Sequence, residues 1–489
     1  MTLAPLWTGL ALVAPLAARV SGRPPAAVGG VSIDTRTLGV NDLFVAIQGD
    51  HSDGHDYVRA AFEKGAAAVV VDEAHARAFA GLGPLYIVND TLRALEGLAR
   101  AARARARGRI VAVTGSVGKT STKEALRLAL SHSGPTHASP ASFNNHWGVP
   151  LTLARLPADA RFGVFEIGMN HAREITPLTD MVRPHVAVVT KIAPVHLEHF
   201  ASLDAIADAK AEIFSGVVKG GAIVLPRDDA QFDRLAGQAK ESAARFVLTF
   251  GAHADADARL IGVQAEGEGS RVEAIVLGQS LVYRLGAPGA HHAVNSLALL
   301  LAARALGADL MTAADALIEF TPPAGRGRRE TLPLGDGTIT VIDESYNANP
   351  ESMRAALDLL GATTGGRRIA VLGDMLELGP RSADLHAALV DDLTRNGVDL
   401  LFTAGPSMAA LHAVAPSALC AAHGAAAEEI APAVCAALRP GDIVMIKGSN
   451  GSRMVQVVAA VREHARRSSS SPPSHPASET APSSAPGPV

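Results

Sequence analysis

Residues 110–122 read IVAVTGSVGKTST, and this stretch predicts a strand, a glycine turn and the start of a helix, around which the α/β fold of the chain is expected to form. Its first four residues are apolar and mostly β-branched, which predicts a buried strand. Residues 123–130 follow with an apolar face of two alanines and two leucines, which predicts a helix. A strand, a glycine turn and a helix in this order hold nucleotide phosphates, because the glycines admit phosphate oxygens to backbone N–H groups and the helix N-terminus adds positive charge. A lysine and a hydroxyl at the turn then neutralise phosphate charge and bind magnesium.

The glycine turn is shorter than the commonest phosphate-binding loop, which has a glycine five positions before Gly118, where Val113 stands here. The alternative is a chance Gly/Ser turn in a glycine-rich chain. The strand and the helix on either side favour a phosphate loop over that alternative. The residues expected to contact the nucleotide are Gly115, Ser116, Val117, Gly118, Lys119, Thr120 and Ser121.

The composition favours compact domains and excludes several classes of protein. A chain of 489 residues is too long for one core, so about two to four domains are expected. A net charge of −4 and 4% aromatic residues give no reason to expect a nucleic-acid partner. The cysteines, Cys420 and Cys435, are too few for a disulfide framework or a zinc site, so we expect two small buried residues in a reduced, cytoplasmic setting.

The two ends of the chain differ from its middle. Residues 6–20 are apolar, but no Lys or Arg precedes them, Pro5 stands directly before them and Pro15 interrupts them, so we expect a helix with a buried face rather than a secretory signal. No other apolar run approaches the length of a bilayer span, which argues against stable membrane insertion. Residues 468–489 are Ser, Pro, Ala and little else, and we expect a disordered tail.

Alternating strand and helix patterns predict an α/β protein with three domains ahead of that tail. Residues 1–92 form a small α/β domain. Residues 93–321 form a central, doubly wound domain around a mostly parallel sheet, beginning with a bridging helix at 93–109 whose arginines are interpreted as a solvated face. Residues 322–467 form a Rossmann-like domain with a second doubly wound sheet.

A candidate magnesium site lies at the carboxyl ends of the central strands, the edge at which open α/β sheets bind ligands. Glu166 lies in the strand predicted at 162–167, and His196 follows the strand predicted at 186–189. A carboxylate, an imidazole and the loop hydroxyl are chemically suitable magnesium ligands. A lone Glu or His at a strand end is more often a surface residue, but convergence on a phosphate loop favours the metal site.

Two further groups of polar residues each admit two interpretations. Asn295, early in an apolar helix, could read a purine edge or cap the helix. A cluster near the N-terminus suits a bidentate grip on phosphate, or is a solvated turn with an ion pair. Its members are Ser32, Asp34, Thr35 and Arg36.

Two loops of the C-terminal half also carry candidate ligands for anions. Residues 322–328 contain two prolines and two glycines that predict a hinge, from which Arg326 would reach a phosphate across a domain cleft. Residues 447–453 read KGSNGSR and are interpreted as an anion nest with charge from Lys447 and Arg453, or else as a solvated turn.

These motifs together resemble the Mur ligase family, the ATP-dependent amide-forming enzymes of peptidoglycan precursor synthesis, over residues 31–467. The motifs that carry the resemblance are TGSVGKTS at 114–121, FEIGMNH at 165–171, HLE at 196–198, KAEIF at 210–214, Asn295 and the Gly-Arg pair at 325–326. The resemblance implies an N-terminal domain that binds a UDP-linked substrate, a central ATP-binding domain and a C-terminal ligase domain.

Three further motifs resemble the family member that adds D-alanyl-D-alanine to UDP-N-acetylmuramoyl-tripeptide. They are NNHWGVP at 144–150, SYNANP at 345–350 and LGDMLELG at 372–379. The Asp-Asn-Pro-Arg motif of the preceding enzyme in the pathway does not occur here. The resemblance therefore implies small-molecule partners, ATP among them, and an enzyme that acts in the cytoplasm; we also expect a monomer.

The family implies a role for each site residue. Lys119, Lys210 and His196 would be catalytic, and Thr120, Glu166, His196 and Lys210 would bind Mg²⁺, with Lys210 converted by CO₂ into a carbamate; an exposed helix lysine is the alternative for Lys210. Asn295, Arg326 and Asp343 would contact ATP together with the glycine loop. Ser32, Asp34, Thr35 and Arg36 would lie near the uridine diphosphate, and the peptide and acceptor would meet Asn145, Tyr346, Asn347 and Asn349.

The implied reaction first converts the peptide carboxylate into an acyl phosphate, which the amine of D-alanyl-D-alanine then attacks. Two residues depart from the family pattern: His292 stands where Asn is usual, and Glu344 where a second Asp is frequent. The alternatives are a phosphotransferase or NTPase, a ligase for another acceptor, and a nucleotide-binding protein without catalysis.

Overall fold

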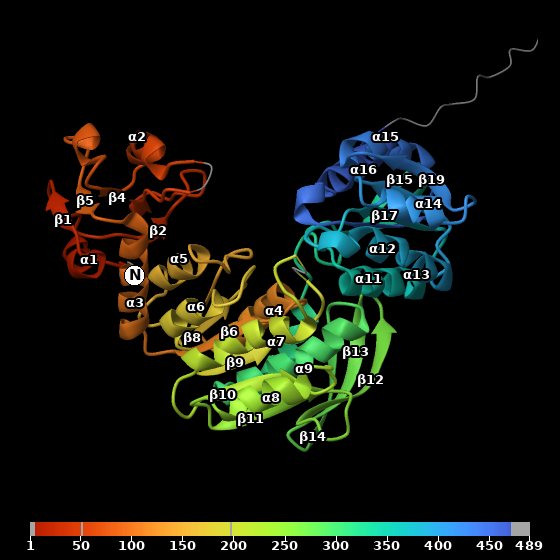
Figure 1. Ribbon diagram of the computed structural model, residues 1–489, viewed down its shortest axis with the longest axis horizontal. Helices are drawn as coiled ribbons and strands as arrows, with labels where there is room; N and C mark the ends of the chain where they lie inside the picture. The colour runs from red at the N-terminus through yellow and green to blue at the C-terminus, as the bar shows by residue number, and fades with distance from the viewer. Residues whose placement is uncertain (1–4, 50–51, 196–197, 471–489) are drawn as a thin grey trace, which may run out of the picture. The chain divides into compact units, whose positions relative to one another are not determined.

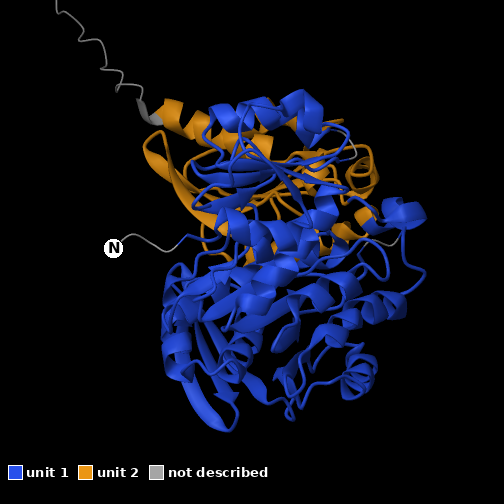
Figure 2. Ribbon diagram, turned by 90° about the vertical axis from the view of Figure 1, so that its left-hand side faces the viewer, with its two compact units in different colours: residues 1–326, 349–355, 376–385 blue, residues 327–348, 356–375, 386–489 orange. Residues whose placement is uncertain are grey.

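A computed structural model describes residues 5–49, 52–195 and 198–470 (Figure 1). The chain divides into two compact units, which Figure 2 distinguishes by colour. Unit 1 comprises Met1–Arg326, Asn349–Ala355 and Leu376–Leu385, and unit 2 comprises Gly327–Ala348, Ala356–Met375 and His386–Val489. Two of the three sheets belong to unit 1 and the third belongs to unit 2.

The first sheet of unit 1 has five strands, in the order β1 (Arg19–Ser21), β5 (Leu85–Val88), β4 (Ala68–Asp72), β3 (Asp42–Val45) and β2 (Gly30–Ser32). All pairs are parallel except β1 with β5. Helices α1 (Gly9–Leu16), α2 (Val58–Glu63) and α3 (Thr91–Arg105) accompany it. The helix expected in the apolar N-terminal segment is confirmed as α1, which buries Leu12 and Leu16 in the core of this sheet.

The interpretation of the arginines at 93–109 as a solvated face holds for Arg93, Arg100, Arg107 and Arg109, which are exposed. It was wrong for Arg103 and Arg105 near the end of α3. Arg103 is 9% exposed and donates from Nε to Val182 O at 2.7 Å and from Nη2 to Arg183 O at 2.8 Å. Arg105 donates to Leu6 O at 2.6 Å, and its guanidinium stacks on the ring of Trp7. A guanidinium presents several donors in one plane, so it can satisfy carbonyl groups left at the ends of neighbouring elements.

The second sheet of unit 1 has nine strands and contains the phosphate loop. Their order is β14 (Gln279–Leu285), β13 (Gly269–Val276), β12 (Ala258–Glu266), β11 (Phe246–Gly251), β10 (Ala222–Pro226), β9 (Val186–Val189), β6 (Arg109–Thr114), β8 (Phe162–Glu166) and β7 (Thr136–Ala138). The strands from β7 to β12 are parallel, and β12, β13 and β14 form an antiparallel extension that the sequence reading did not anticipate.

Helices cover both faces of this sheet, as the doubly wound prediction requires. Val111, Val113 and their neighbours pack with α4 (Lys119–Ser131), α9 (Ala290–Ala305) and α10 (Leu310–Ala316). Ile110 and Ala112 point the other way and pack with α5 (Gly148–Ala154), α6 (Ile175–Val182), α7 (Leu203–Ala211) and α8 (Phe232–Lys240). A strand buried on both faces needs a continuous apolar run, which is what β6 has.

Unit 2 contains a six-stranded sheet, in the order β15 (Arg328–Leu334), β16 (Gly337–Glu344), β20 (Ile443–Lys447), β17 (Arg368–Gly373), β18 (Leu400–Ala404) and β19 (Cys420–Gly424). Only β15 and β16 pair antiparallel. The helices of unit 2 are α13 (Leu389–Arg395), α14 (Ala409–Val414), α15 (Ala427–Ala437) and α16 (Val455–Ser470), while α11 (Pro350–Ala362) and α12 (Ser382–Ala387) each have residues in both units. Short 3₁₀ helices are η1 (Gly54–Tyr57), η2 (Ala76–Phe79), η3 (Glu212–Gly216), η4 (Leu317–Glu319), η5 (Gly379–Arg381) and η6 (Asn450–Ser452).

The C-terminal helix, the two cysteines and the apolar segments bear on three of the expectations from the sequence. Helix α16 continues to Ser470, so the first three residues of the predicted disordered tail are helical, and the rest of that tail lies outside the described residues. Cys420 and Cys435 carry free thiols and are partly rather than fully buried. None of the helices in the described ranges is both long and apolar enough to cross a membrane.

Candidate active site

The glycine loop connects β6 to α4, and both of its glycines have a positive φ. Gly115 has φ 141° and Gly118, the residue that caps α4, has φ 87°, a region that side chains rarely adopt. A Cβ at position 115 would lie 2.1 Å from Thr190 Oγ1, and one at position 118 would lie 2.7 Å from Asn295 Nδ2. The positive φ at both positions, together with the backbone N atoms of Thr190 and Lys191 at 3.1 and 3.2 Å from a Cβ at position 115, favours glycine in this loop.

Residues that follow strand β9 hold the loop in place. Ser116 donates from its backbone N–H to Lys191 O at 2.7 Å and from Oγ to Ala193 O at 3.0 Å. Thr190 donates from Oγ1 to Val117 O at 2.6 Å. Thr190 was missed in the sequence, although its position directly after the strand predicted at 186–189 pointed to this edge of the sheet. These bonds fix the loop as a preformed concave turn at the N-terminus of a helix, the geometry that favours anions.

Lys119 lies within the turn and is only partly exposed. Its Nζ donates to Gly115 O at 2.7 Å and to Ser116 O at 3.3 Å. Burial lowers the pKa of Lys119 to about 8; the negative charge of Glu166 opposes this shift and the positive charge of Arg326 adds to it. A cation held inside the loop by the loop's own carbonyls is positioned for a phosphate group bound there.

Glu166 lies at the carboxyl end of β8, is 1% exposed and forms the centre of a polar network. Thr120 Oγ1 donates to Glu166 Oε2 at 2.8 Å, and Asn144 Nδ2 donates to Glu166 Oε1 at 2.7 Å. Ser142 Oγ lies 3.1 Å from Thr120 Oγ1 and accepts a bond from Arg326 Nη2 at 3.0 Å. The hydroxyl and the carboxylate that the sequence paired as metal ligands are therefore direct neighbours.

Asn144, which precedes the predicted acceptor residue Asn145 in the motif at 144–150, is the residue whose side chain reaches the carboxylate. Asn145 Oδ1 instead accepts from the backbone N–H groups of Gly148, at 2.9 Å, and Trp147, at 3.3 Å, which stabilises the turn before α5. Ser142 and Asn144 were not singled out beforehand. Asn144 stood inside a quoted motif, whereas no pattern marked Ser142.

Lys210 lies near the end of α7 and is 1% exposed, so the alternative of an exposed helix lysine was wrong. Burial, reinforced by the positive charge of Lys119, lowers the pKa of Lys210 well below its ordinary value, although Glu212, Glu174 and Glu166 act in the opposite direction. Lys210 is thus electrostatically coupled to the phosphate loop and holds an amine that readily loses its proton. His196, predicted as a metal ligand, lies outside the described residues.

Asn295 does not cap its helix, because the residue at the N-cap of α9 is Gly289. Its side chain instead faces Gly118 in the loop. Together with Ser121, His292 and Phe320 it lines a small hollow beside the first turns of α4. His292, one of the departures from the family pattern, is buried there, and burial together with the neighbouring His291 lowers its pKa well below the usual range. A neutral imidazole at this place presents hydrogen-bonding groups without adding charge.

The cluster predicted to lie near the uridine diphosphate contains an ion pair between Asp34 and Arg36, as the interpretation as a solvated turn expects. Arg36 Nη2 donates to Asp34 Oδ2 at 2.7 Å, and this hydrogen bond, opposed by burial, lowers the pKa of Asp34. Ser32 is buried and its Oγ donates to Asp34 O at 3.0 Å, while Lys64 Nζ donates to Thr35 O at 2.8 Å. The Arg36 side chain remains 87% exposed, so the pair leaves donors free to face a ligand.

In unit 2, Asp343 is buried at the end of β16, and its Oδ1 accepts from the hydroxyl of Ser345 at 2.6 Å. Lys447 is also buried and donates to Glu344 Oε2 at 3.2 Å and to Asn347 O at 3.0 Å. Its charge is therefore committed to a partner within unit 2, which weakens the interpretation of residues 447–453 as an anion nest.

The remaining acceptor residues have local backbone roles as well. Asn347 Oδ1 accepts from Ala348 N at 3.0 Å, and Tyr346 is 39% exposed. Asn349 precedes α11, and its Oδ1 accepts from Ser352 N at 2.9 Å, as a helix-capping residue does.

Comparison with known proteins places these elements in a family. Three family models match the chain: "Mur ligase family, catalytic domain" at residues 27–105, "Mur ligase middle domain" at 113–303, and "Mur ligase, glutamate ligase domain" at 327–450. The chain belongs to the Mur ligase family, as the sequence motifs indicated.

Among curated relatives, the UDP-N-acetylmuramoyl-tripeptide–D-alanyl-D-alanine ligase of Rickettsia prowazekii is 31% identical over 428 residues, covering 88% of this chain and 94% of the relative. The ligase of the same name from Escherichia coli is 33% identical over 439 residues, covering 89% and 94%. A crystal structure of MurF from Acinetobacter baumannii has a TM-score of 0.82 and 28% identity, covering 95% of this chain and all of that one. MurF ligase from Thermotoga maritima, solved in complex with ADP, has a TM-score of 0.73 at 24% identity, covers 90% and 98%, and supports the fold.

Proposed function

We propose that this protein is an ATP-dependent ligase that joins D-alanyl-D-alanine to UDP-N-acetylmuramoyl-tripeptide in peptidoglycan precursor synthesis, an activity of class EC 6.3.2.10. The names of its curated relatives support the choice of substrates. The single observation that carries the chemistry is the direct bond between Thr120 and Glu166 beside Lys119 in the glycine loop. That arrangement suits phosphoryl transfer from a nucleoside triphosphate.

We propose that residues 115–121 hold the phosphates of ATP, with Lys119 neutralising charge on the group that is transferred. The concave turn offers backbone N–H groups from the first turn of α4, and the helix N-terminus adds partial positive charge. Asn295 would contact the nucleotide beside Gly118, and Arg326 would add a second cation near the transferred phosphate, since its charge already acts on Lys119. Asp343 would also contact the nucleotide, as the family resemblance implies.

The residues around Glu166 fit a magnesium ion. Mg²⁺ prefers oxygen ligands and keeps several waters, and here a hydroxyl oxygen and a carboxylate oxygen lie 2.8 Å apart. Asn144 fixes the second carboxylate oxygen, which orients the group for binding. When bound, the ion would neutralise charge as the anionic carboxylate of the substrate approaches the anionic phosphate. His196 would complete the ligand set.

Lys210 fits the proposed carbamate because its amine is buried and loses its proton readily. An uncharged amine can form an N–C bond to CO₂ with release of one proton, which replaces a cation by an anion. The change would relieve the repulsion between Lys210 and Lys119 and would add an oxygen ligand for the metal. Intact-protein mass measured under native conditions with and without added bicarbonate tests for the extra CO₂.

The proposed reaction has two steps, and in each the chain's own residues handle charge. The peptide carboxylate attacks the γ-phosphorus of ATP, the bond to the β-phosphate oxygen breaks, and ADP leaves as an acyl phosphate forms. The amine of the dipeptide then attacks the acyl carbon, loses a proton, and phosphate departs with the electrons of the C–O bond. Lys119 and Arg326 stabilise the negative charge that develops on the phosphoryl oxygens.

We assign the remaining substrate groups on weaker grounds. Ser32, Asp34, Thr35 and Arg36 would receive the uridine diphosphate, supported by the exposed guanidinium of Arg36. Asn145, Tyr346, Asn347 and Asn349 would lie near the peptide and the acceptor. We further propose that the enzyme acts in the cytoplasm, where ATP is available, and that it acts as a monomer.

One assay tests the proposal. Phosphate release is measured with UDP-N-acetylmuramoyl-tripeptide and ATP, with and without D-alanyl-D-alanine, and the ligated pentapeptide is identified by mass. Release should depend on the dipeptide and match product formation one to one. Phosphate release at the same rate with and without the dipeptide would instead identify a phosphotransferase or NTPase. Product formation with a single amino acid in place of the dipeptide would identify a ligase for another acceptor.

A further inference from the structure

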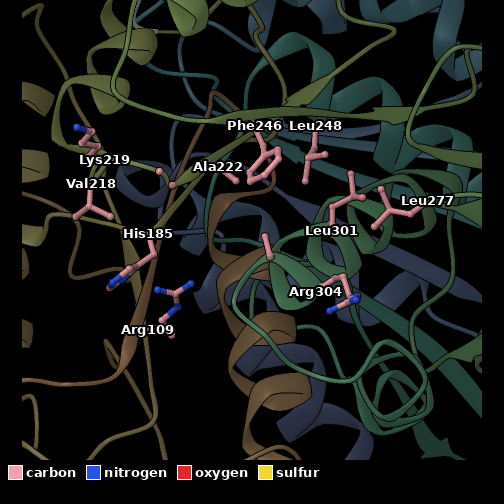
Figure 3. Close-up of a pocket in the computed structure, with 13 residues that line it drawn as sticks. Arg109, His185, Val218, Lys219, Ala222, Phe246, Leu248, Leu277, Leu301 and Arg304 are labelled. Carbon is pink, nitrogen blue, oxygen red and sulfur yellow. The ribbon is translucent and has the colours of Figure 1, made fainter.

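A cavity of about 470 Å³ lies at the amino ends of the central strands, at the edge of the sheet opposite the phosphate loop (Figure 3). Arg109 begins β6, His185 directly precedes β9, Ala222 begins β10 and Phe246 begins β11, and all four line the cavity. The phosphate loop follows the other end of β6, about 20 Å away for a strand of this length. The cavity is thus separate from the proposed catalytic site, and its volume is in the range of small-molecule sites.

The charged side chains that line the cavity are all basic. They are Arg109, Lys219 and Arg304, with His185 beside them, and no carboxylate is among the lining residues. Neither Arg109 nor Lys219 forms an ion pair or a side-chain hydrogen bond with another residue of the described chain. The positive charge of Arg304 contributes to lowering the pKa of Asp309, which is not among the lining residues. Uncompensated positive charge lining a concave surface attracts anions.

The state of His185 agrees with a positive electrostatic potential. Its Nδ1 accepts a hydrogen bond from Ile110 N at 2.9 Å, so the ring proton is on Nε2. Burial, together with the positive charges of Arg103, Arg109 and Arg183, lowers the pKa of His185 to about 4. The ring is therefore a neutral N–H donor among cations, a combination that suits the oxygen of an anion better than a cationic or apolar group.

The rest of the wall is apolar and open to solvent. Phe246 is 50% exposed and Leu277 is 46% exposed, which is unusual for large apolar residues that line a concavity. Figure 3 shows Phe246 beside Leu248 along one side, Leu277 and Leu301 near Arg304, and Arg109 with His185 across from them. Covering these side chains would remove apolar surface from water, so a ligand with an apolar body is favoured over an inorganic ion.

We propose that this cavity binds a small amphipathic anion, with a phosphate, sulfonate or carboxylate head against Arg109 and Arg304 and an aromatic or branched apolar body against Phe246 and Leu277. The site is a second ligand site of the chain, distinct from the one that handles ATP. Its lining contains no carboxylate, hydroxyl or thiol, and we assign it a binding role.

The test uses 8-anilinonaphthalene-1-sulfonate as a fluorescent amphipathic anion, titrated into the full chain. The double variant Arg109→Gln/Arg304→Gln should weaken binding about tenfold or more, since it removes two charges and keeps a polar side chain at each position. Its matched control is Arg59→Gln/Arg77→Gln, two exposed arginines of the five-stranded-sheet region, which should bind the probe as the wild type does. Phe246→Ser should also weaken binding, and Val282→Ser, equally exposed on β14, should not.

Competition identifies the chemistry. The neutral analogue N-phenyl-1-naphthylamine and inorganic phosphate should each displace the probe poorly, and affinity should fall as salt is added. Equal binding by wild type and by both cavity variants would overturn the proposal, as would equal losses in cavity and control variants. Co-sedimentation of the chain with phosphatidylglycerol vesicles without binding of the soluble probe would also overturn it, because the charge would then serve a membrane surface. Ligation by Arg109→Gln/Arg304→Gln should be unchanged, and its melting curve confirms that it folds.

Discussion

Replacing Lys119 by methionine should abolish ligation and at the same time stabilise the folded chain. These two effects rarely coincide, and the structure gives a reason for each. Lys119 would neutralise charge that develops on the transferred phosphoryl group, and removing one such donor from a preorganised site typically lowers kcat by about 100- to 1000-fold. The same ammonium is held in a place where burial disfavours its charge.

The gain in stability follows from the pKa of Lys119. Lowering that pKa from 10.5 to about 8 corresponds to about 3 kcal/mol against the charged form in the folded state. The bonds from Nζ to Gly115 O and Ser116 O offset about 1–2 kcal/mol of this, so Lys119→Met should gain about 1–2 kcal/mol at pH 7. Between about pH 8 and 10.5 the unfolded state binds more protons than the folded state, so the wild type gains stability as pH rises and the difference from the variant shrinks.

A matched control lies one turn along the same helix. Lys123 is fully buried, but its Nζ donates to Ser139 O and Ala141 O, both at 2.8 Å, and pairs with Glu124. Lys123→Met should therefore destabilise the chain by about 2–4 kcal/mol, because it leaves buried acceptors without a donor. Urea denaturation at pH 7 and pH 10 compares both variants with the wild type, and coupled phosphate release measures activity. If Lys119→Met ligates within tenfold of the wild type, or loses as much stability as Lys123→Met, the account of this lysine is wrong.

Three further outcomes are expected from the same site and from its support. Glu166→Gln should lower kcat by about 100-fold or more and raise the Mg²⁺ concentration needed for half-maximal rate, measured by a metal titration, because an amide is a poorer metal ligand than a carboxylate. Gly118→Ala should impair ATP binding in calorimetry, because its Cβ would lie 2.7 Å from the side-chain amide of Asn295. The control Gly81→Ala has a similar φ but open space around the Cβ, so it should lower the free energy of unfolding by only about 1 kcal/mol and leave ATP binding unchanged. Equal ATP affinity in both variants would contradict the steric argument. Arg103→Met should cost about 2–3 kcal/mol in urea denaturation and Arg100→Met less than about 0.5 kcal/mol, because only the first is buried and bonded to two carbonyls; similar costs would contradict this.

Much of the architecture follows from local patterns in the chain. The strand predicted at 186–189 has those bounds in β9, and the helix predicted after the glycine turn is α4. These elements could be predicted because a parallel strand covered on both faces must be apolar throughout, which leaves an unambiguous signal. The antiparallel strands β12 to β14 were not anticipated, because alternation on a half-exposed edge is a weaker pattern.

The candidate site was predictable where a residue type is tied to a motif. The phosphate loop, Glu166 and Lys210 were all named from the sequence, and the burial of Lys210 agrees with its family resemblance rather than with an exposed helix lysine. Asn144 was not singled out although it stands beside Asn145 in a quoted motif, since only the path of the chain decides which side chain turns toward the carboxylate. Arg103 of α3 was misjudged for a related reason, because its partners are carbonyls about 80 residues away.

The sequence by itself determined the α/β class, the phosphate loop and the family, because glycine, lysine and apolar periodicity act through contacts only a few residues apart. Tertiary structure alone decided which side chains meet at the loop, the burial of Lys210 and the basic cavity at the far edge of the sheet. Those features join residues from separate strands, whose distances depend on strand order, and strand order is set by packing of the whole sheet.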